Sequence, residues 1–228
     1  AKGGRKILMS ISEDILRQII VEVLQQMQGP EKTVASRPDD SPVIGFVDVG
    51  PARSGATRHE VVIGLPPAFG VSSTETIINI PHRDVLREVM AGIEEEGLAA
   101  RVIKVHRTAD VGFIAHEAAK LSGSGIGIGI ISRGTTVIHQ KDLAPLQNLE
   151  LFSQSPLVEL DTFRAIGRNA AKYAKGESPT PVPVRNDPMV RPSFQGLAAL
   201  LHNKEVQFVH PDGVSVEVKI GRASCRER

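Results

Sequence analysis

The alternation of apolar and polar residues divides the chain into three parts. Residues 10–28 place apolar side chains every three to four positions, which predicts an amphipathic helix with one wide apolar face. Gly29-Pro30 ends this pattern, and the segment after it is rich in proline, serine and charged residues, as linkers are. We therefore expect a helix and linker over residues 1–42, a folded domain over residues 43–220 and a polar tail over residues 221–228.

Within the central part, short apolar runs alternate with longer segments that have helical periodicity. The apolar runs predict strands at residues 61–64, 101–105 and 126–131. The periodic segments predict helices at residues 84–96, 110–121 and 161–175, with Asp110 and Asp161 as N-terminal caps and Gly97 and Gly176 at the C-terminal ends. Strands that alternate with helices of this length predict an α/β fold with a mostly parallel sheet and helices on its faces.

The last part of this domain has a different character. Residues 177–192 hold five prolines, which favour an extended arm because proline lacks the backbone N–H that helices and strands use. Such an arm has few internal hydrogen bonds, so its conformation has to be fixed by contacts outside its own backbone. Two further runs, at residues 205–210 and 214–220, flank the turn sequence Pro211-Asp212-Gly213 and predict a terminal hairpin.

The composition excludes several classes of function. The net charge of +1, the absence of tryptophan and the single tyrosine argue against a nucleic-acid-binding protein, which needs a basic surface and stacking side chains. No apolar run approaches the length that spans a bilayer, and no signal-peptide core follows the basic first residues. The lone cysteine, Cys225, rules out a disulfide within the chain and a cysteine-based metal cluster. We expect a cytoplasmic protein without nucleic-acid or membrane partners.

Residues 121–136 are the strongest candidate for a ligand site. Their glycines would let the backbone approach a ligand closely, and Arg133 with the neighbouring hydroxyl groups suits a phosphate or an amide. The glycines run through an apparent strand, so they do not form the dinucleotide-binding fingerprint, which opens a helix. The alternative is structural, since a strand packed closely beneath a helix would contain the same glycines. The pattern leaves both interpretations open.

No set of residues has an evident catalytic arrangement. The seven histidines lack the spacing of metal ligands, and only His139 follows the glycine-rich strand closely enough to be of interest. The run Glu94-Glu95-Glu96 at a helix C-terminus is explained better by a solvated face or a partner surface than by a catalytic pair. We therefore expect no catalytic residue and no metal ligand, which is typical of a binding subunit.

Three long runs resemble one family closely. They are IPHRDVLREVMAGIEEEGLAARVIK (80–104), LSGSGIGIGIISRGTTVIHQKDLAPLQNLELFSQSPL (121–157) and IGRNAAKYAKGESPTPVPVRNDPMVRP (166–192). They resemble the medium subunit of diol and glycerol dehydratases that depend on adenosylcobalamin (coenzyme B12), over roughly residues 58–210. The resemblance implies a Rossmann-like domain that contacts cobalamin in a heterohexamer with large and small subunits. The large subunit, a TIM barrel, would hold the diol (1,2-propanediol or glycerol) and convert it by a radical mechanism to an aldehyde and water, so this chain alone is not expected to be active.

The resemblance also implies contacts with the cofactor, position by position. They are Asp110, Arg133, Thr135, Leu146, Asn148 and Arg191. Asp110 is expected near the peripheral amides of the corrin, and Leu146 and Asn148 at the pocket of the dimethylbenzimidazole base. Arg133 is expected at the nucleotide-loop phosphate or the amide oxygens, and Arg191, on the proline-rich arm, near the cofactor. The family's motif has lysine where this chain has Arg133, and the two cations are not interchangeable.

Further partners follow from the same resemblance. Residues 10–28 resemble the short helices that dock cargo on the shells of bacterial microcompartments, with packing on a neighbouring subunit as the alternative. The reactivating factor of the dehydratase is another expected partner. A different assignment stays open, because the small subunit of the dehydratase-reactivating chaperone resembles the core of the same domain. A generic nucleotide-binding α/β protein is disfavoured by the missing fingerprint.

Overall fold

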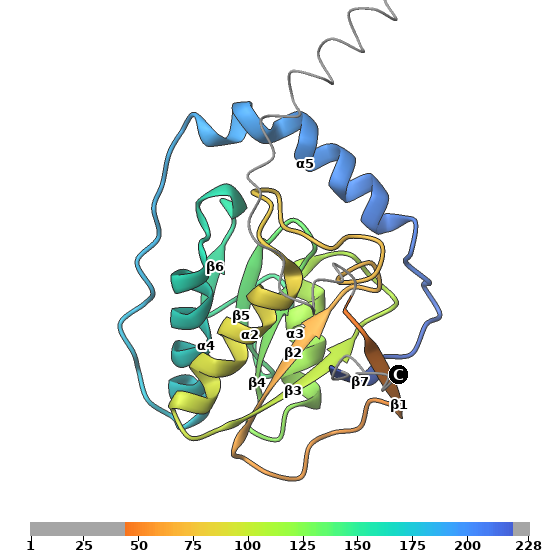
Figure 1. Ribbon diagram of the computed structural model, residues 1–228. Coiled ribbons are helices and arrows are strands. Elements are labelled where there is room, and N and C mark those ends of the chain that lie inside the picture. The colour runs from red at the N-terminus through yellow and green to blue at the C-terminus, as the bar shows by residue number, and fades with distance from the viewer. Residues whose placement is uncertain (1–43, 221–228) are drawn as a thin grey trace, which may run out of the picture. The chain divides into compact units, whose positions relative to one another are not determined.

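The structure, a computed structural model, describes residues 44–220; the predicted helix at 10–28, the linker and the tail with Cys225 lie outside them. The described residues form a seven-stranded mixed sheet in the order β1-β7-β3-β2-β4-β5-β6 (Figure 1). The strands are β1 (Phe46–Pro51), β2 (Glu60–Leu65), β3 (Ala99–Lys104), β4 (Ile126–Ile130), β5 (Thr136–Gln140), β6 (Glu150–Phe152) and β7 (Val216–Ile220). The three central strands, β3, β2 and β4, run parallel, and the other neighbouring pairs are antiparallel.

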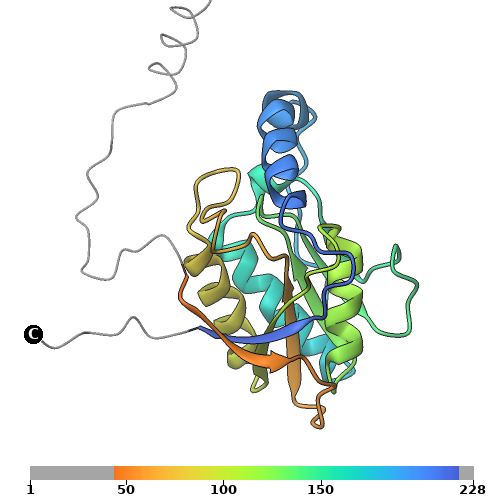
Figure 2. The same ribbon diagram turned by 90° about the vertical axis from the view of Figure 1, so that its right-hand side faces the viewer.

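Helices cover both faces of this sheet. They are α2 (His82–Glu95), α3 (Val111–Leu121), α4 (Leu160–Ala174) and α5 (Val190–Val206), with a short 3-10 turn η1 (Ser155–Leu157). Helices α2 and α4 pack against each other on one face, and α3 covers the opposite face (Figure 2). The prediction of an α/β fold with helices on both faces is confirmed. No helix within residues 44–220 is long and apolar enough to cross a membrane.

The glycine-rich strand β4 owes its sequence to packing against α3. Its isoleucines are buried in the core that faces α2 and α4. Its two glycines, Gly127 and Gly129, face the other way, where α3 comes very close. A Cβ atom on Gly127 would lie 2.3 Å from the backbone nitrogen of Ala119, and one on Gly129 would lie 2.7 Å from that of Ala115. The structural interpretation of these glycines as a strand packed closely beneath a helix is therefore confirmed.

Most of the predicted helix and strand positions are confirmed, and one predicted cap is wrong. The strands at 61–64, 101–105 and 126–131 correspond to β2, β3 and β4, and the helices to α2, α3 and α4. Asp110 caps α3 as predicted, because its Oδ1 accepts hydrogen bonds from Gly112 N (2.9 Å) and Phe113 N (3.2 Å). The cap of α4 is at Glu159, without a side-chain hydrogen bond, and Asp161 lies inside the first turn.

The predicted terminal hairpin is wrong. Residues 205–206 belong to the end of α5, and β7 inserts between β1 and β3, antiparallel to both. The turn sequence at Pro211 therefore leads from a helix into a sheet strand whose partners lie far away in the sequence. The proline-rich arm is also shorter than predicted. Residues 177–187 have no helix or strand, but Pro192 lies in the first turn of α5, where the missing N–H has no partner to lose.

Candidate functional site

The carboxyl ends of the parallel strands meet at one edge of the sheet. After β2 the chain passes through α2 to β3 on one side, and after β3 it crosses by α3 to β4 on the other side. The ends of β2 and β4 therefore flank a topological switch point, where open α/β sheets bind their ligands. Helix α5 lies across this edge (Figure 1).

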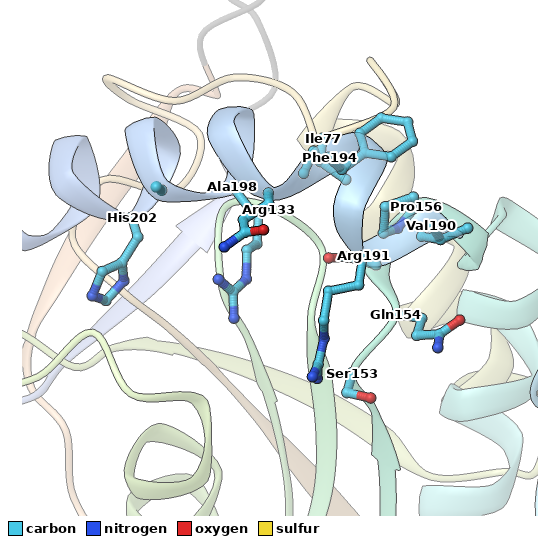
Figure 3. Close-up of a pocket in the computed structure, with 13 residues that line it drawn as sticks. Ile77, Arg133, Ser153, Gln154, Pro156, Val190, Arg191, Phe194, Ala198 and His202 are labelled. Atoms are coloured by element: carbon cyan, nitrogen blue, oxygen red, sulfur yellow. The ribbon is translucent and has the colours of Figure 1, made fainter. Parts of the chain in front are cut away.

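A hollow of about 440 Å³ lies beneath α5 at this edge. The loop after β4 contributes Arg133, the segment after β6 contributes Ser153 and Gln154, and α5 contributes Arg191 and Phe194. The side chains of both arginines extend into the space beneath α5, and that of Arg191 points toward Ser153 (Figure 3). The hollow thus combines cationic, hydrogen-bonding and apolar side chains from segments far apart in the sequence.

The two arginines give this hollow its electrostatic character. Arg133 is half-buried, and its Nε donates to Thr135 Oγ1 at 3.0 Å, which fixes the plane of the guanidinium. Arg191 lies in the first turn of α5, where the helix dipole adds further positive potential. Among residues 44–220, no carboxylate lies within ion-pair distance of either arginine. In contrast, Arg101 and Arg164 each bind two carboxylates.

Asp110 borders a second hollow, of about 400 Å³, which shares Arg133 and His202 with the first. Its Oδ1 atom caps α3, and its Oδ2 atom accepts no hydrogen bond from the part of the chain that the structure describes. The structure therefore brings four of the six predicted cofactor residues to one edge of the sheet. They are Asp110, Arg133, Thr135 and Arg191.

Leu146 and Asn148 lie apart from the arginine-lined hollow. Both are exposed in the loop between β5 and β6, and Leu146 is 77% exposed. The loop passes close to the start of α3, because a Cβ atom on Gly112 would lie 2.9 Å from the carbonyl oxygen of Pro145. These two residues therefore border the Asp110 side of the edge and not the Arg191 side.

Two residues that the sequence did not identify hold the Arg133 loop in place. The N–H of Ser132 donates to Glu205 Oε1 at 2.8 Å, and the carbonyl of Ser132 contacts His82 Nε2 at 2.7 Å. Because His82 Nδ1 accepts from Gly70 N at 3.0 Å, the proton is on Nε2 and is donated to Ser132. Burial lowers the pKa of His82 to about 4, so the ring is neutral. No periodicity or spacing in the sequence distinguishes either residue.

The other singled-out residues have structural roles. His139 is buried, its Nδ1 contacts the carbonyl of Gln140 at 2.7 Å, and its ring lies 4.9 Å from that of His116. Within the described residues no group of three or more histidines, cysteines and acidic residues could hold a metal ion. The run Glu94-Glu95-Glu96 is more than a solvated or partner-facing surface. Glu95 and Glu96 form ion pairs with basic side chains of α4.

Together, the fold and this edge define an α/β domain with a hollow lined by two arginines at the switch point of its sheet. The chain belongs to the dehydratase medium subunit family, whose model matches residues 66–180, half of the sequence. Arg191 and Glu205 lie beyond the matched residues.

Two solved structures are partly similar to the chain. A glycerol dehydratase reactivase is 20% identical and aligns 55% of this chain with 96% of its own length, at a TM-score of 0.43. A diol dehydratase-reactivating factor complexed with ADP and Mg²⁺ is 26% identical and aligns 57% of this chain with all of its own length, at a TM-score of 0.40.

Proposed function

We propose that this chain is the medium subunit of an adenosylcobalamin-dependent diol or glycerol dehydratase and binds the nucleotide-loop side of the cofactor. The observation that carries the proposal is the convergence of Arg133 and Arg191 on one hollow, with no carboxylate of residues 44–220 within ion-pair distance of either. Two guanidinium groups that share a site repel each other unless an anion lies between them. A phosphate diester is the anion that a cobalamin tail would bring there.

The residues around the hollow fit the tail of the cofactor. Besides the two arginines, the hydroxyl of Ser153 offers a hydrogen bond to a ribose or amide group, and Phe194 offers apolar surface. A volume of about 440 Å³ suits a fragment of a ligand, so the rest of a corrin would extend toward another subunit. When bound, adenosylcobalamin supplies the radical that starts dehydration, and this chain binds and orients one side of it.

The second hollow and the exposed loop extend the same proposal. The Oδ2 atom of Asp110 is free to accept from a corrin amide, and Leu146 and Asn148 offer an apolar and an amide side chain to the dimethylbenzimidazole base. Exposure of a side chain as large as that of Leu146 is consistent with a surface that a partner or a ligand covers. The large subunit is the partner we expect to cover it and to hold the substrate.

The alternative function is that of the small subunit of the dehydratase-reactivating chaperone. A small subunit of that chaperone would pair with an ATP-binding chain and would need no cationic hollow for a cobalamin tail. The match to the medium subunit family runs through Asp110, Arg133, Thr135 and the loop with Leu146, which favours the dehydratase.

Cobalamin affinity of the assembled complex tests the proposal. The chain is co-expressed with its large and small partner subunits, and equilibrium binding of cyanocobalamin is compared between wild type, Arg133→Ala and Arg191→Ala. Loss of a charged hydrogen bond should cost about 1–3 kcal/mol, a rise in Kd of about 5- to 150-fold, for Arg133→Ala. Arg58→Ala removes the same charge from the opposite edge of the sheet and should leave Kd unchanged. Equal affinity in all four complexes would remove the arginines from the site.

A further inference from the structure

Helix α5 covers the hollow with only partial burial of its apolar residues, since Val190, Phe194, Ala198 and Leu201 are half-buried. Glu205, near its C-terminal end, is the only residue of the helix that is fully buried, at 1% exposure. Leu197 and Leu200, in contrast, are 43% and 67% exposed. Helices on a folded core usually hold their place by burying an apolar stripe. Half-buried apolar contacts therefore hold this helix together with one fully buried residue, Glu205.

Glu205 is joined directly to the loop that carries Arg133. Its Oε1 atom accepts the N–H of Ser132 at 2.8 Å, and His82 holds the carbonyl of the same residue from the side of α2. Both backbone polar groups of Ser132 are thus bound, one by each helix. Without Glu205 the N–H of Ser132 would be buried and unsatisfied, which is costly.

The turn after Ser132 is closed, so its position fixes the direction of Arg133. Gly134 N donates to Ile131 O at 2.8 Å, and Ile131 N donates to Thr135 O at 3.1 Å. Gly134 has a φ of +100°, a conformation that glycine adopts more readily than other residues. A shift of Ser132 would therefore move the whole turn, and Arg133 with it.

The N-terminal end of α5 is held by two hydrogen bonds of Gln154. Gln154 accepts the N–H of Asp187 at 3.0 Å and donates to Asn186 Oδ1 at 2.5 Å, just before the helix begins. The helix is therefore fastened to the domain at both ends. Between the two fastenings lie Arg191, Phe194 and His202, which line the hollow.

We propose that Glu205 is a positioning residue that couples α5 to the Arg133 loop, so that Arg133 and Arg191 face the same anion. This inference rests on the proposed function, because the anion is the cobalamin phosphate. Burial raises the pKa of Glu205, while Ser132, Arg133 and His202 act in the opposite direction. What the coupling needs is an acceptor oxygen for the N–H of Ser132. A glutamine at this position supplies that oxygen and an alanine does not.

Two substitutions separate positioning from charge. Three variants of the full chain are each co-expressed with the large and small subunits: Glu205→Ala, Glu205→Gln and a control, Lys204→Ala. Lys204 is an exposed neighbour on the same helix. Cyanocobalamin Kd is measured for each assembled complex, with hydrogen exchange of residues 131–135 and of α5. Glu205→Ala should raise Kd about tenfold, in the range expected for a buried donor left unsatisfied, and should speed exchange in both segments. The Kd of Glu205→Gln should stay within about threefold of the wild-type Kd, and the Kd of Lys204→Ala should equal the wild-type Kd.

Each other outcome has a defined meaning. Wild-type Kd for Glu205→Ala, with Arg133→Ala still weakened, would overturn the positioning role and leave the proposed function standing. Wild-type Kd for Arg133→Ala and Arg191→Ala as well would contradict the proposed function itself. If Glu205→Ala does not assemble, Glu205→Gln decides, since a Kd raised as much as for Arg133→Ala would contradict a role that needs only an acceptor.

Discussion

The cationic hollow depends on how single side chains are oriented. Thr135, which is buried, accepts from Arg133 Nε and leaves the outer nitrogens of the guanidinium for a ligand. Lysine, the residue in the family's motif, has no equivalent of Nε and could not be held in this way. The resemblance predicts Asp110, Arg133 and Arg191 as site residues, and the structure places all three at one edge of the sheet. It did not identify His82 or Glu205, because residues that act through a backbone hydrogen bond leave no spacing or composition signal.

The neutral state of His82 makes stability depend on pH. Its pKa is lowered from 6.5 to about 4 by burial, so the unfolded chain binds a proton below pH 6.5 that the folded chain does not accept until about pH 4. Stability from this residue is therefore complete above pH 6.5 and is lost as the pH falls toward 4. The loss should reach about 3 kcal/mol, as a shift of this size implies.

Urea unfolding of the full chain between pH 7 and pH 4 measures this effect. His82→Gln retains a donor for the carbonyl of Ser132 but cannot titrate, so its unfolding free energy should fall by about 3 kcal/mol less than that of wild type over the same range. The same pH dependence in both proteins would show that His82 is not the group responsible.

At the level of elements, sequence patterns predicted the helices and strands that nearby residues determine. They missed the elements that depend on contacts with distant segments. Strands β2 to β4 and helices α2 to α4 follow from periodicity and from caps such as Asp110 and Gly97. Strand β7 was assigned to a hairpin because its true partners, β1 and β3, lie more than a hundred residues away in the sequence. Helix α5 was missed because the prolines at 188 and 192 indicated an extended chain, although a proline is tolerated in the first turn of a helix.

The close contact between β4 and α3 gives a prediction for this pair of elements. Gly127→Ala would place a Cβ atom against the backbone of Ala119, so α3 has to move outward. We expect the unfolding free energy of the full chain to fall by about 1–3 kcal/mol, measured by urea denaturation. Gly196→Ala, in α5 with nothing within 4 Å of the new atom, should instead be neutral or stabilising by up to about 1 kcal/mol. Equal stability of both variants would contradict this account of the glycine-rich strand.

At the level of the whole molecule, the proposed function makes one edge of the domain a binding surface within an assembly. The edge with the two hollows, the exposed Leu146 loop and the sparsely packed α5 all belong to one side of the sheet. The proline-rich arm leads to the same side and, as expected, is fastened by contacts outside its own backbone. Asn169 donates to Thr180 O at 2.9 Å and Glu150 accepts Val182 N at 2.8 Å. A site that collects residues from so many segments suits a cofactor shared between subunits.

The segment before the domain should be separable from catalysis. We expect that removal of residues 1–42 leaves the dehydratase activity of the assembled complex unchanged and alters its solubility or its location. The reason is that the apolar face predicted for residues 10–28 favours docking or association. Activity assays and co-sedimentation with microcompartment shells measure the two effects. Loss of subunit stoichiometry in the truncated complex would instead make the helix part of the assembly.

Partner choice in the presence and absence of cobalamin tests the central claim most directly. The full chain is used to pull down either the dehydratase large subunit or the ATP-binding chain of the reactivating chaperone, with and without added cobalamin. If the hollow beneath α5 holds the cofactor tail, the chain joins the large subunit stably, and the complex retains cobalamin through washing. Recovery with the chaperone chain alone, to the same extent with and without cobalamin, would contradict the assignment of this chain as the cobalamin-binding medium subunit.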